Sequence, residues 1–274
     1  MATPALQRPV QRITPPGDIA HRVSASIPLE FQTREEIALT SRDGEATGAM
    51  NKAVSGLAIG LIAFLMSPTG VSDMQSNTEA RGTIQLPEPA RSGVVSLEEA
   101  LSQRRSVREF LPDALTDRQL SQLFWAVQGI TAPDGYRTAP SAGALYPLEV
   151  YVAMPAGFYH YVPTKHCLTL VSANDLRLVL CHAALDQEAI REAGAVFVIA
   201  AVYARTAQKY GATRGERYVH LEAGHAAQNL LLEAGALGLG AVPMGAFHDA
   251  EVQKVLSLPR NHAPLYLIPV GRPR

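Results

Sequence analysis

The chain has 274 residues and a formal net charge of −1, so no overall electrostatic field attracts nucleic acid. No RNA-recognition, zinc-finger or helix-turn-helix pattern occurs either, and we expect no nucleic-acid partner. Hydrophobic residues make up 47% and charged residues 18%, which is typical of a folded chain with one substantial domain and a tail, or with two small domains.

The first 72 residues divide into a polar tail and an apolar segment. Residues 1–49 are rich in Pro, Ser, Thr and Arg and have no sustained helical or strand period. Residues 50–72 contain the three parts of a secretory signal peptide: a basic start at Met50-Asn51-Lys52, an apolar run and a small-residue region. We therefore expect an exported, periplasmic protein that is cleaved after Ser72. We also expect translation to start at Met50, so that residues 1–49 are an over-extended start or a disordered tail.

Two alternatives stay open for residues 50–72. The apolar run is shorter than the ~20 residues that span a bilayer, yet an uncleaved N-terminal anchor and a buried helix both remain compatible with it. An anchor brings membrane contact, whereas a buried helix leaves a cytoplasmic protein. Residues 73–95 are predicted to be a polar linker punctuated by prolines, and residues 96–274 the folded domain.

Helices are predicted at the start of this domain. Ser96 is a good N-cap for the first, because acidic residues follow it in the first turn. The second begins at Thr116 and ends at Gly129, with apolar residues on one face: Leu120, Leu123, Phe124 and Val127. A further helix is expected over residues 174–185.

Strands are predicted between and after these helices. Residues 148–154 and 157–162 indicate a hairpin. Residues 195–203 are apolar without alternation, which is typical of a central strand covered on both faces. The last strand is expected over residues 264–270. Helices and strands interleave irregularly, so we predict an α+β domain with a mixed central sheet flanked by helices.

A long helix over residues 214–236 has apolar residues almost all round, which indicates burial. Gly224, Ala226 and Ala227 on this helix would let a partner helix approach closely.

Arginines dominate the segment Arg104-Arg105-Ser106-Val107-Arg108. A guanidinium group donates bidentate hydrogen bonds and stays charged, so this cluster suits a doubly charged anion. Gly271-Arg272 supplies a further arginine near the C-terminus. The alternative is a solvated basic face at a helix end.

Two glycine-containing loops follow the cluster along the chain. The first is Pro140-Ser141-Ala142-Gly143-Ala144-Leu145-Tyr146-Pro147, and the second is Gly238-Leu239-Gly240-Ala241-Val242-Pro243-Met244-Gly245. The second resembles the start of a dinucleotide fingerprint. It follows a long helix, however, and has Pro243 in place of the third glycine, so a Rossmann site is rejected.

The order and spacing of these motifs resemble the nitroreductase superfamily of flavoproteins, and within it the SagB/ThcOx branch of FMN-dependent dehydrogenases. The resemblance covers residues 84–274. It also includes the segments Ser96-Leu97-Glu98-Glu99-Ala100-Leu101, Leu120-Ser121-Gln122-Leu123-Phe124-Trp125-Ala126 and Glu222-Ala223-Gly224-His225-Ala226-Ala227-Gln228-Asn229-Leu230.

The resemblance implies an intertwined homodimer with a nitroreductase-like fold and FMN at the dimer interface. It assigns the FMN phosphate and ribityl chain to Arg104, Arg105, Ser106, Arg108 and Arg272. It assigns the flavin ring to two loops, of which the first typically comes from the other subunit: Pro140, Ser141 and Gly143, and Pro243, Met244 and Gly245.

Lys209-Tyr210 matches the Lys-Tyr pair of the azoline-oxidising branch. The resemblance implies that Lys209 removes a proton while flavin takes a hydride from the adjacent carbon of a small-molecule or peptide substrate. The alternative is an exposed pair on an amphipathic helix.

Three functions stay open: a dehydrogenase of this branch, a nitro- or quinone reductase that uses NAD(P)H, and a flavin-binding protein without turnover. No metal site is predicted, because His220 and His225 are five residues apart rather than the four of a metalloprotease helix. Cys167 and Cys181 are expected to be buried free thiols, with a disulfide open if the protein is exported.

Overall fold

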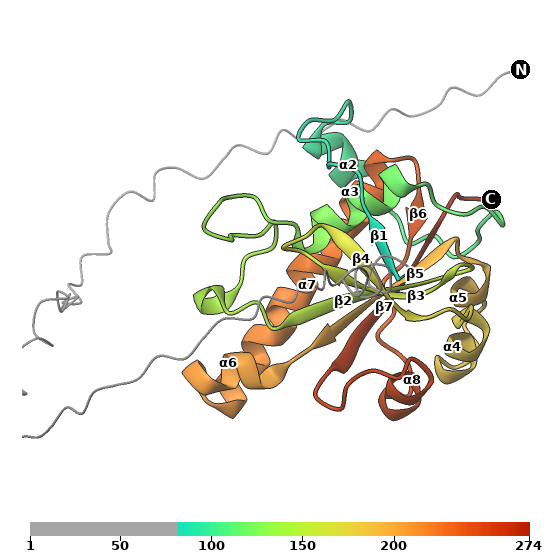
Figure 1. Ribbon diagram of the computed structural model, residues 1–274. Helices are drawn as coiled ribbons and strands as arrows, with labels where there is room; N and C mark the ends of the chain where they lie inside the picture. The colour runs from blue at the N-terminus through green and yellow to red at the C-terminus, as the bar shows by residue number, and fades with distance from the viewer. Residues whose placement is uncertain (1–81) are drawn as a thin grey trace, which may run out of the picture. The chain divides into compact units, whose positions relative to one another are not determined.

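The computed structural model describes residues 82–274, so the predictions for residues 1–49 and 50–72 lie outside the described residues. Helices and strands alternate irregularly along residues 82–274, which confirms the α+β class (Figure 1). No helix in the described range is both long and apolar enough to cross a membrane.

The described residues form a sheet of seven strands in the order β1-β4-β3-β2-β5-β7-β6. All neighbouring strands in it pair antiparallel, and the parallel pairing in this range is an isolated bridge between Ser106 and Ala241. The prediction of a mixed sheet is therefore wrong for the strands themselves. Tight turns join β2 to β3 and β3 to β4, and such turns produce antiparallel neighbours. The strands are β1 (Thr83–Gln85), β2 (Leu148–Met154), β3 (Gly157–Val162), β4 (Cys167–Ser172), β5 (Ala195–Ala201), β6 (Gly240–Ala241) and β7 (Ala263–Gly271).

Helices cover both faces of this sheet (Figure 1). Helices α3 and α7 pack on one face, and α4, α5 and α8 pack on the other. The helices are α2 (Leu97–Gln103), α3 (Asp117–Gln128), the 3-10 turn η1 (Ala142–Ala144), α4 (Arg177–Ala183), α5 (Glu188–Glu192), α6 (Tyr203–Tyr210), α7 (Ala212–Ala236) and α8 (Asp249–Val255).

Strand β5 is the centre of the core, as its unbroken apolar sequence predicts. All seven of its residues are buried, and it pairs with β2 on one side and β7 on the other. Phe197 and Ile199 pack toward α3 and α7, while Val196 and Val198 pack toward α4, α5 and α8. Because successive side chains of a strand point to opposite faces, one apolar strand supplies both halves of the core.

The predicted helix caps are confirmed. The Ser96 side chain accepts a hydrogen bond from the backbone of Glu99 at 3.1 Å. Thr116 forms a capping box with Gln119, which satisfies two backbone donors that a helix N-terminus leaves free, and Gly129 ends α3. The hairpin of β2 and β3 is also confirmed.

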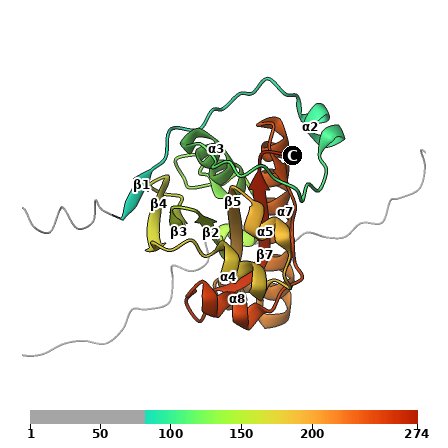
Figure 2. The same ribbon diagram turned by 90° about the vertical axis from the view of Figure 1, so that its right-hand side faces the viewer.

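Two predictions are corrected. Thr83–Gln85, expected within a linker, form the edge strand β1, because Ile84 packs against the core and the backbone pairs with β4. From β1 the chain passes over α3 to reach α2 (Figure 2). Helix α7 is buried on one face rather than all round, because only that face meets α3 and the sheet. On its other face Leu221 is 51% exposed.

Candidate functional site

The arginine segment lies along the short strand β6. The backbone amide of Val107 donates to the carbonyl of Ala241 at 3.1 Å. Gly240 is required beside it, since a Cβ there would lie 2.6 Å from a methyl carbon of Val107. None of Arg104, Arg105 and Arg108 forms an ion pair with another described residue.

The C-terminal arginine reaches the same edge of the sheet. The backbone of Leu111 donates to the carbonyl of Arg272 at 2.9 Å, and Phe110 bridges to Pro273. The Arg272 guanidinium forms an ion pair with Asp113. We call Arg104, Arg105, Ser106, Arg108 and Arg272 the arginine edge, because the backbone contacts of Val107 with Ala241 and of Leu111 with Arg272 bring the two segments to one edge of the sheet.

The loop after β6 adjoins the arginine edge. Met244 is buried and exchanges two backbone hydrogen bonds with Leu267, at 2.8 and 3.0 Å. Pro243 is half-buried and Gly245 exposed. These hydrogen bonds hold the loop against β7, the strand that leads to Arg272.

The first glycine loop meets the predicted catalytic pair. At Gly143, φ is +65°, and an added Cβ would lie 2.8 Å from the Tyr210 hydroxyl and 2.9 Å from Nζ of Lys209. Ser141 fixes the loop, because its Oγ accepts from the backbone of Tyr146 at 2.9 Å. Pro140 is exposed. The structure thus places Lys209 and Tyr210 against this loop within one chain.

Helix α7 separates the two groups of predicted residues. Lys209 and Tyr210 precede its first turn, and β6 follows its last turn, so the groups lie at opposite ends of the helix (Figure 1). Its 25 residues span about 37 Å at a rise of 1.5 Å per residue. Within one chain, the catalytic pair and the arginine edge do not form one compact site.

A network of charged residues near Lys209 was not predicted. Glu149 on β2 forms ion pairs with Arg205 and with His160, the latter at 2.7 Å. Burial raises the pKa of Glu149, but hydrogen bonds from His160 and Arg205 outweigh it and lower the pKa to about 2. Of these three residues, only Arg205 could have been found from the sequence. It precedes Lys209 by four residues, a spacing that places both side chains on one face of a helix.

A buried carboxyl group on α7 was also missed. Glu222 is 2% exposed, and its Oε1 has no hydrogen-bond partner. Burial raises the pKa of Glu222 to about 7, although Ser141, Arg137 and Gln128 favour the ionised form. The nearby histidines His220 and His225 are exposed and do not face a common site with it.

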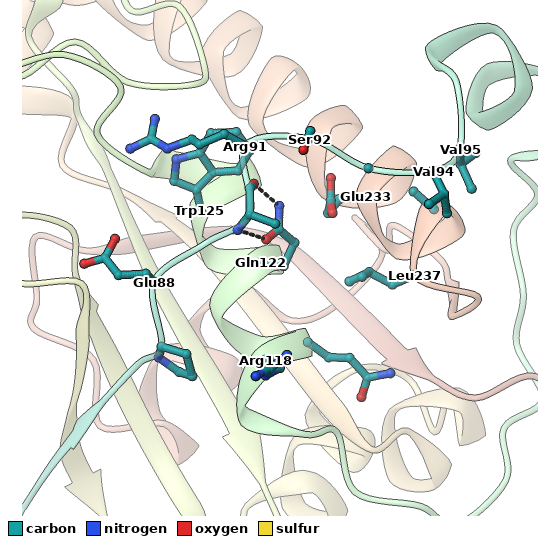
Figure 3. Close-up of a pocket in the computed structure, with 15 residues that line it drawn as sticks. Glu88, Arg91, Ser92, Val94, Val95, Arg118, Gln122, Trp125, Glu233 and Leu237 are labelled. Carbon is teal, nitrogen blue, oxygen red and sulfur yellow. Dashed lines mark hydrogen bonds between the residues drawn. The ribbon is translucent and has the colours of Figure 1, made fainter.

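A further cavity is lined by a different set of residues. It measures about 780 Å³ and lies between residues 87–95 and helices α3 and α7 (Figure 3). The Gln122 side chain holds the covering segment through two hydrogen bonds with the backbone of Ala90, at 2.9 and 3.1 Å. Arg91 lies over the ring of Trp125 at 5.4 Å. No predicted site residue lines this cavity.

Comparison with known proteins gives a consistent result. Residues 101–272 match the Nitroreductase family. The protein MJ1384 of Methanocaldococcus jannaschii, assigned to the nitroreductases, is 45% identical over 195 residues, which cover 69% of this chain and 96% of MJ1384. The microcin B17-processing protein McbC of Escherichia coli is 29% identical over 198 residues, which cover 64% of this chain and 72% of McbC.

Among solved structures, a protein of Ralstonia eutropha assigned to the nitroreductases aligns with a TM-score of 0.64 and 34% identity. The alignment covers 70% of this chain and 90% of that protein. The fold, the range matched by the family and the sequence identity to these relatives all indicate the same family. The chain belongs to the nitroreductase family and is an FMN-dependent oxidoreductase.

Proposed function

We propose that the protein is an FMN-dependent dehydrogenase of the SagB/ThcOx type, which removes hydride and a proton from an azoline-like small molecule or peptide. The observation that carries this proposal is the position of Lys209 and Tyr210 against Gly143. The resemblance assigns Lys209 to proton abstraction and the Gly143 loop to the flavin. The likeness to McbC, which is named for processing microcin B17, favours a peptide substrate.

The residues of the arginine edge fit the phosphate of FMN. Three of its arginines lack an ion pair among the described residues, and several charged donors are what a nearly doubly charged group needs on binding. Arg272 pairs with Asp113, but both side chains are largely exposed, and exposed pairs are worth only ~0–1 kcal/mol. A phosphate can therefore displace Asp113 from Arg272.

The two loops fit the flavin ring. Pro140, Ser141 and Gly143 carry little side-chain bulk, and in the second loop Gly245 is exposed beside the buried Met244 and the half-buried Pro243. Bound FMN supplies a two-electron acceptor. The residues of the chain hold the phosphate, orient the substrate and accept its proton at Nζ of Lys209.

The separation along α7 supports a homodimer as part of the proposal. A two-fold axis across α7 places the start of one helix beside the end of its copy. Each FMN then contacts the arginine edge of one chain and the Gly143 loop of its partner. Leu221, half-exposed on the outer face of α7, is positioned to be covered by the second chain.

A second candidate is a nitro- or quinone reductase fed by NAD(P)H, which the assignment of MJ1384 and of the R. eutropha protein to the nitroreductases favours. A flavin-binding protein without turnover is the remaining class. Export through residues 50–72 also stays a proposal. An N-terminal residue at position 73 in protein recovered from the periplasm would support it, and an intact segment would contradict it.

The three functions separate in one anaerobic experiment on the full-length chain. FMN is identified by an absorbance band near ~450 nm and by the mass of the released cofactor. Bleaching by a thiazoline donor but not by NADPH supports the dehydrogenase. Bleaching by NADPH supports the reductase. If neither donor bleaches the flavin, the result supports a flavin-binding protein without turnover.

The role of Lys209 needs its own comparison. Lys209→Ala is expected to lower thiazoline-dependent bleaching at least a hundredfold, because general-base catalysis contributes about 10²–10⁴-fold. FMN content should stay unchanged. The exposed Lys254 on α8 provides the control, and Lys254→Ala should behave as the wild type. Equal rates in both variants would remove Lys209 from the mechanism.

A further inference from the structure

A second cavity opens one helical turn from the catalytic lysine. It measures about 420 Å³, which is within the ~300–1,000 Å³ of small-molecule sites. Its walls come from the end of α3, the segment after it, β2, β3 and α6. Arg205 lines it and lies four residues before Lys209, so both side chains project from one face of α6 about 6 Å apart along the axis.

The cavity contains an arginine with too few partners. Nη1 of Arg137 donates to Oε1 of Gln128 at 2.8 Å. Nε of Arg137 is buried and has no acceptor, and no described residue accepts from Nη2. The Cζ atom of Arg137 lies over the ring of Tyr146, 4.3 Å from the ring centroid, and this contact helps to hold the guanidinium at the cavity wall.

The charges around Arg137 leave it uncompensated. It forms no ion pair with any described residue. Glu149 is already paired with Arg205 and His160. Glu222 is the other carboxyl group nearby, but it forms no ion pair with Arg137, and burial raises its pKa to about 7. A half-buried cation without a counter-ion is costly, and an anionic ligand would remove that cost.

We propose that this cavity binds a carboxylate group of the substrate, held by Nη2 of Arg137 beside the ring of Tyr146. A carboxylate fits because its oxygens accept hydrogen bonds from Nη2 of Arg137, the guanidinium nitrogen that is neither bonded to Gln128 nor buried, and because it carries a negative charge. The cavity that would hold the group is also lined by Arg205, one helical turn before Lys209 on α6. Only the assignment of this carboxylate to the substrate rests on the proposed function.

Binding can be measured without turnover. Isothermal titration of the full-length, FMN-loaded protein with benzoate and with its neutral isostere benzamide should show benzoate binding at least tenfold more tightly. Arg137→Gln should weaken benzoate binding at least tenfold, because it removes the charge-assisted hydrogen bond to the carboxylate, and leave benzamide binding unchanged. Arg91→Gln removes an arginine that lies over Trp125 outside this cavity, and it should change neither affinity.

Other outcomes would overturn the assignment. Benzoate binding that is equal in Arg137→Gln and the wild type excludes Arg137 as the anion donor. Inorganic phosphate that displaces benzoate with higher affinity would make the cavity a nucleotide-phosphate site instead. If Arg137→Gln fails to fold, Arg137→Lys keeps the charge without the planar fork, and it should lose benzoate affinity three- to tenfold. Thiazoline-dependent bleaching that persists without benzoate binding would reject this site and leave the proposed function standing.

Discussion

The backbone of Gly143 lies against the hydroxyl of Tyr210, so that a Cβ on Gly143 would approach that oxygen to 2.8 Å. No side chain can be added without displacing Tyr210 or Lys209, whose Nζ is 2.9 Å from the same point. The loop is thus shaped around Lys209 and Tyr210 of its own chain, the pair that we propose to be catalytic.

Gly143→Ala is therefore expected to reduce turnover at least tenfold, by displacing Lys209 and Tyr210. The positive φ at position 143 also makes alanine less favourable there, which lowers the free energy of unfolding by about 1–2 kcal/mol. Gly135→Ala is the matched control, since Gly135 has φ +86° and nothing within 4 Å of an added Cβ. Both variants should lose similar stability in urea unfolding, and only Gly143→Ala should lose activity. Equal activity in the two variants would contradict this packing.

The protonation of Glu222 should make stability depend on pH. The pKa of Glu222 is raised by burial to about 7, above its ordinary value of 4.5, so its favourable contribution is complete below pH 4.5 and is lost as pH rises through 7. Glu222→Gln removes the cost of ionisation. It should raise the free energy of unfolding by up to about 3 kcal/mol at pH 8, and by little at pH 5. Glu216→Gln, exposed on the same helix, should show no such difference. A gain independent of pH would contradict the shift.

Glu149 should show the opposite dependence. The pKa of Glu149 is lowered to about 2, because hydrogen bonds from His160 and Arg205 outweigh burial, so it stabilises the fold above pH 4.5 and less as pH falls toward 2. Glu149→Gln is expected to cost about 2–3 kcal/mol of unfolding free energy at pH 7, since it leaves Arg205 unpaired. Glu188→Gln breaks an exposed ion pair with Arg191 and should cost under ~1 kcal/mol. Similar losses in both variants would show that the half-buried pair of Glu149 and Arg205 contributes no more stability than an exposed pair.

The dimer can be tested at the outer face of α7. Leu221→Asp should convert a dimer to a monomer in light scattering and lower FMN content, because a buried charge disfavours the contact between subunits. Leu178→Asp is matched to it, as Leu178 is also 51% exposed but lies on α4, against the other face of the sheet. Dissociation by Leu178→Asp alone would place the interface on α4.

Local signals in the sequence predicted most of the fold correctly. Ser96, Thr116 and Gly129 are capping residues with a direct physical role at helix ends, and the structure confirms all three. The uninterrupted apolar run of β5 likewise predicts burial on both faces. By contrast, β1 has three residues, and its pairing with β4 depends on a partner about eighty residues away that no local pattern reveals.

The candidate site divides in the same way. Lys209-Tyr210, the glycine loops and residues 104–108 of the arginine edge are compact motifs, so a resemblance could identify them. Arg137, Glu149 and Glu222 come from three separate segments and become a network only on folding. A buried glutamate is indistinguishable from a surface one in sequence, because its neighbours along α7 are both polar and apolar.

The length of α7 has a genetic consequence. If one chain contributes the lysine and its partner the arginine edge, two inactive variants can complement each other. Mixing the Lys209→Ala and Arg108→Ala subunits would give hybrid dimers. In each hybrid, one site lacks both Lys209 and Arg108, and the other site contains both. Random reassociation of equal amounts then restores about a quarter of the wild-type activity, since half the dimers are hybrids with one intact site. Sites confined to single chains would restore none.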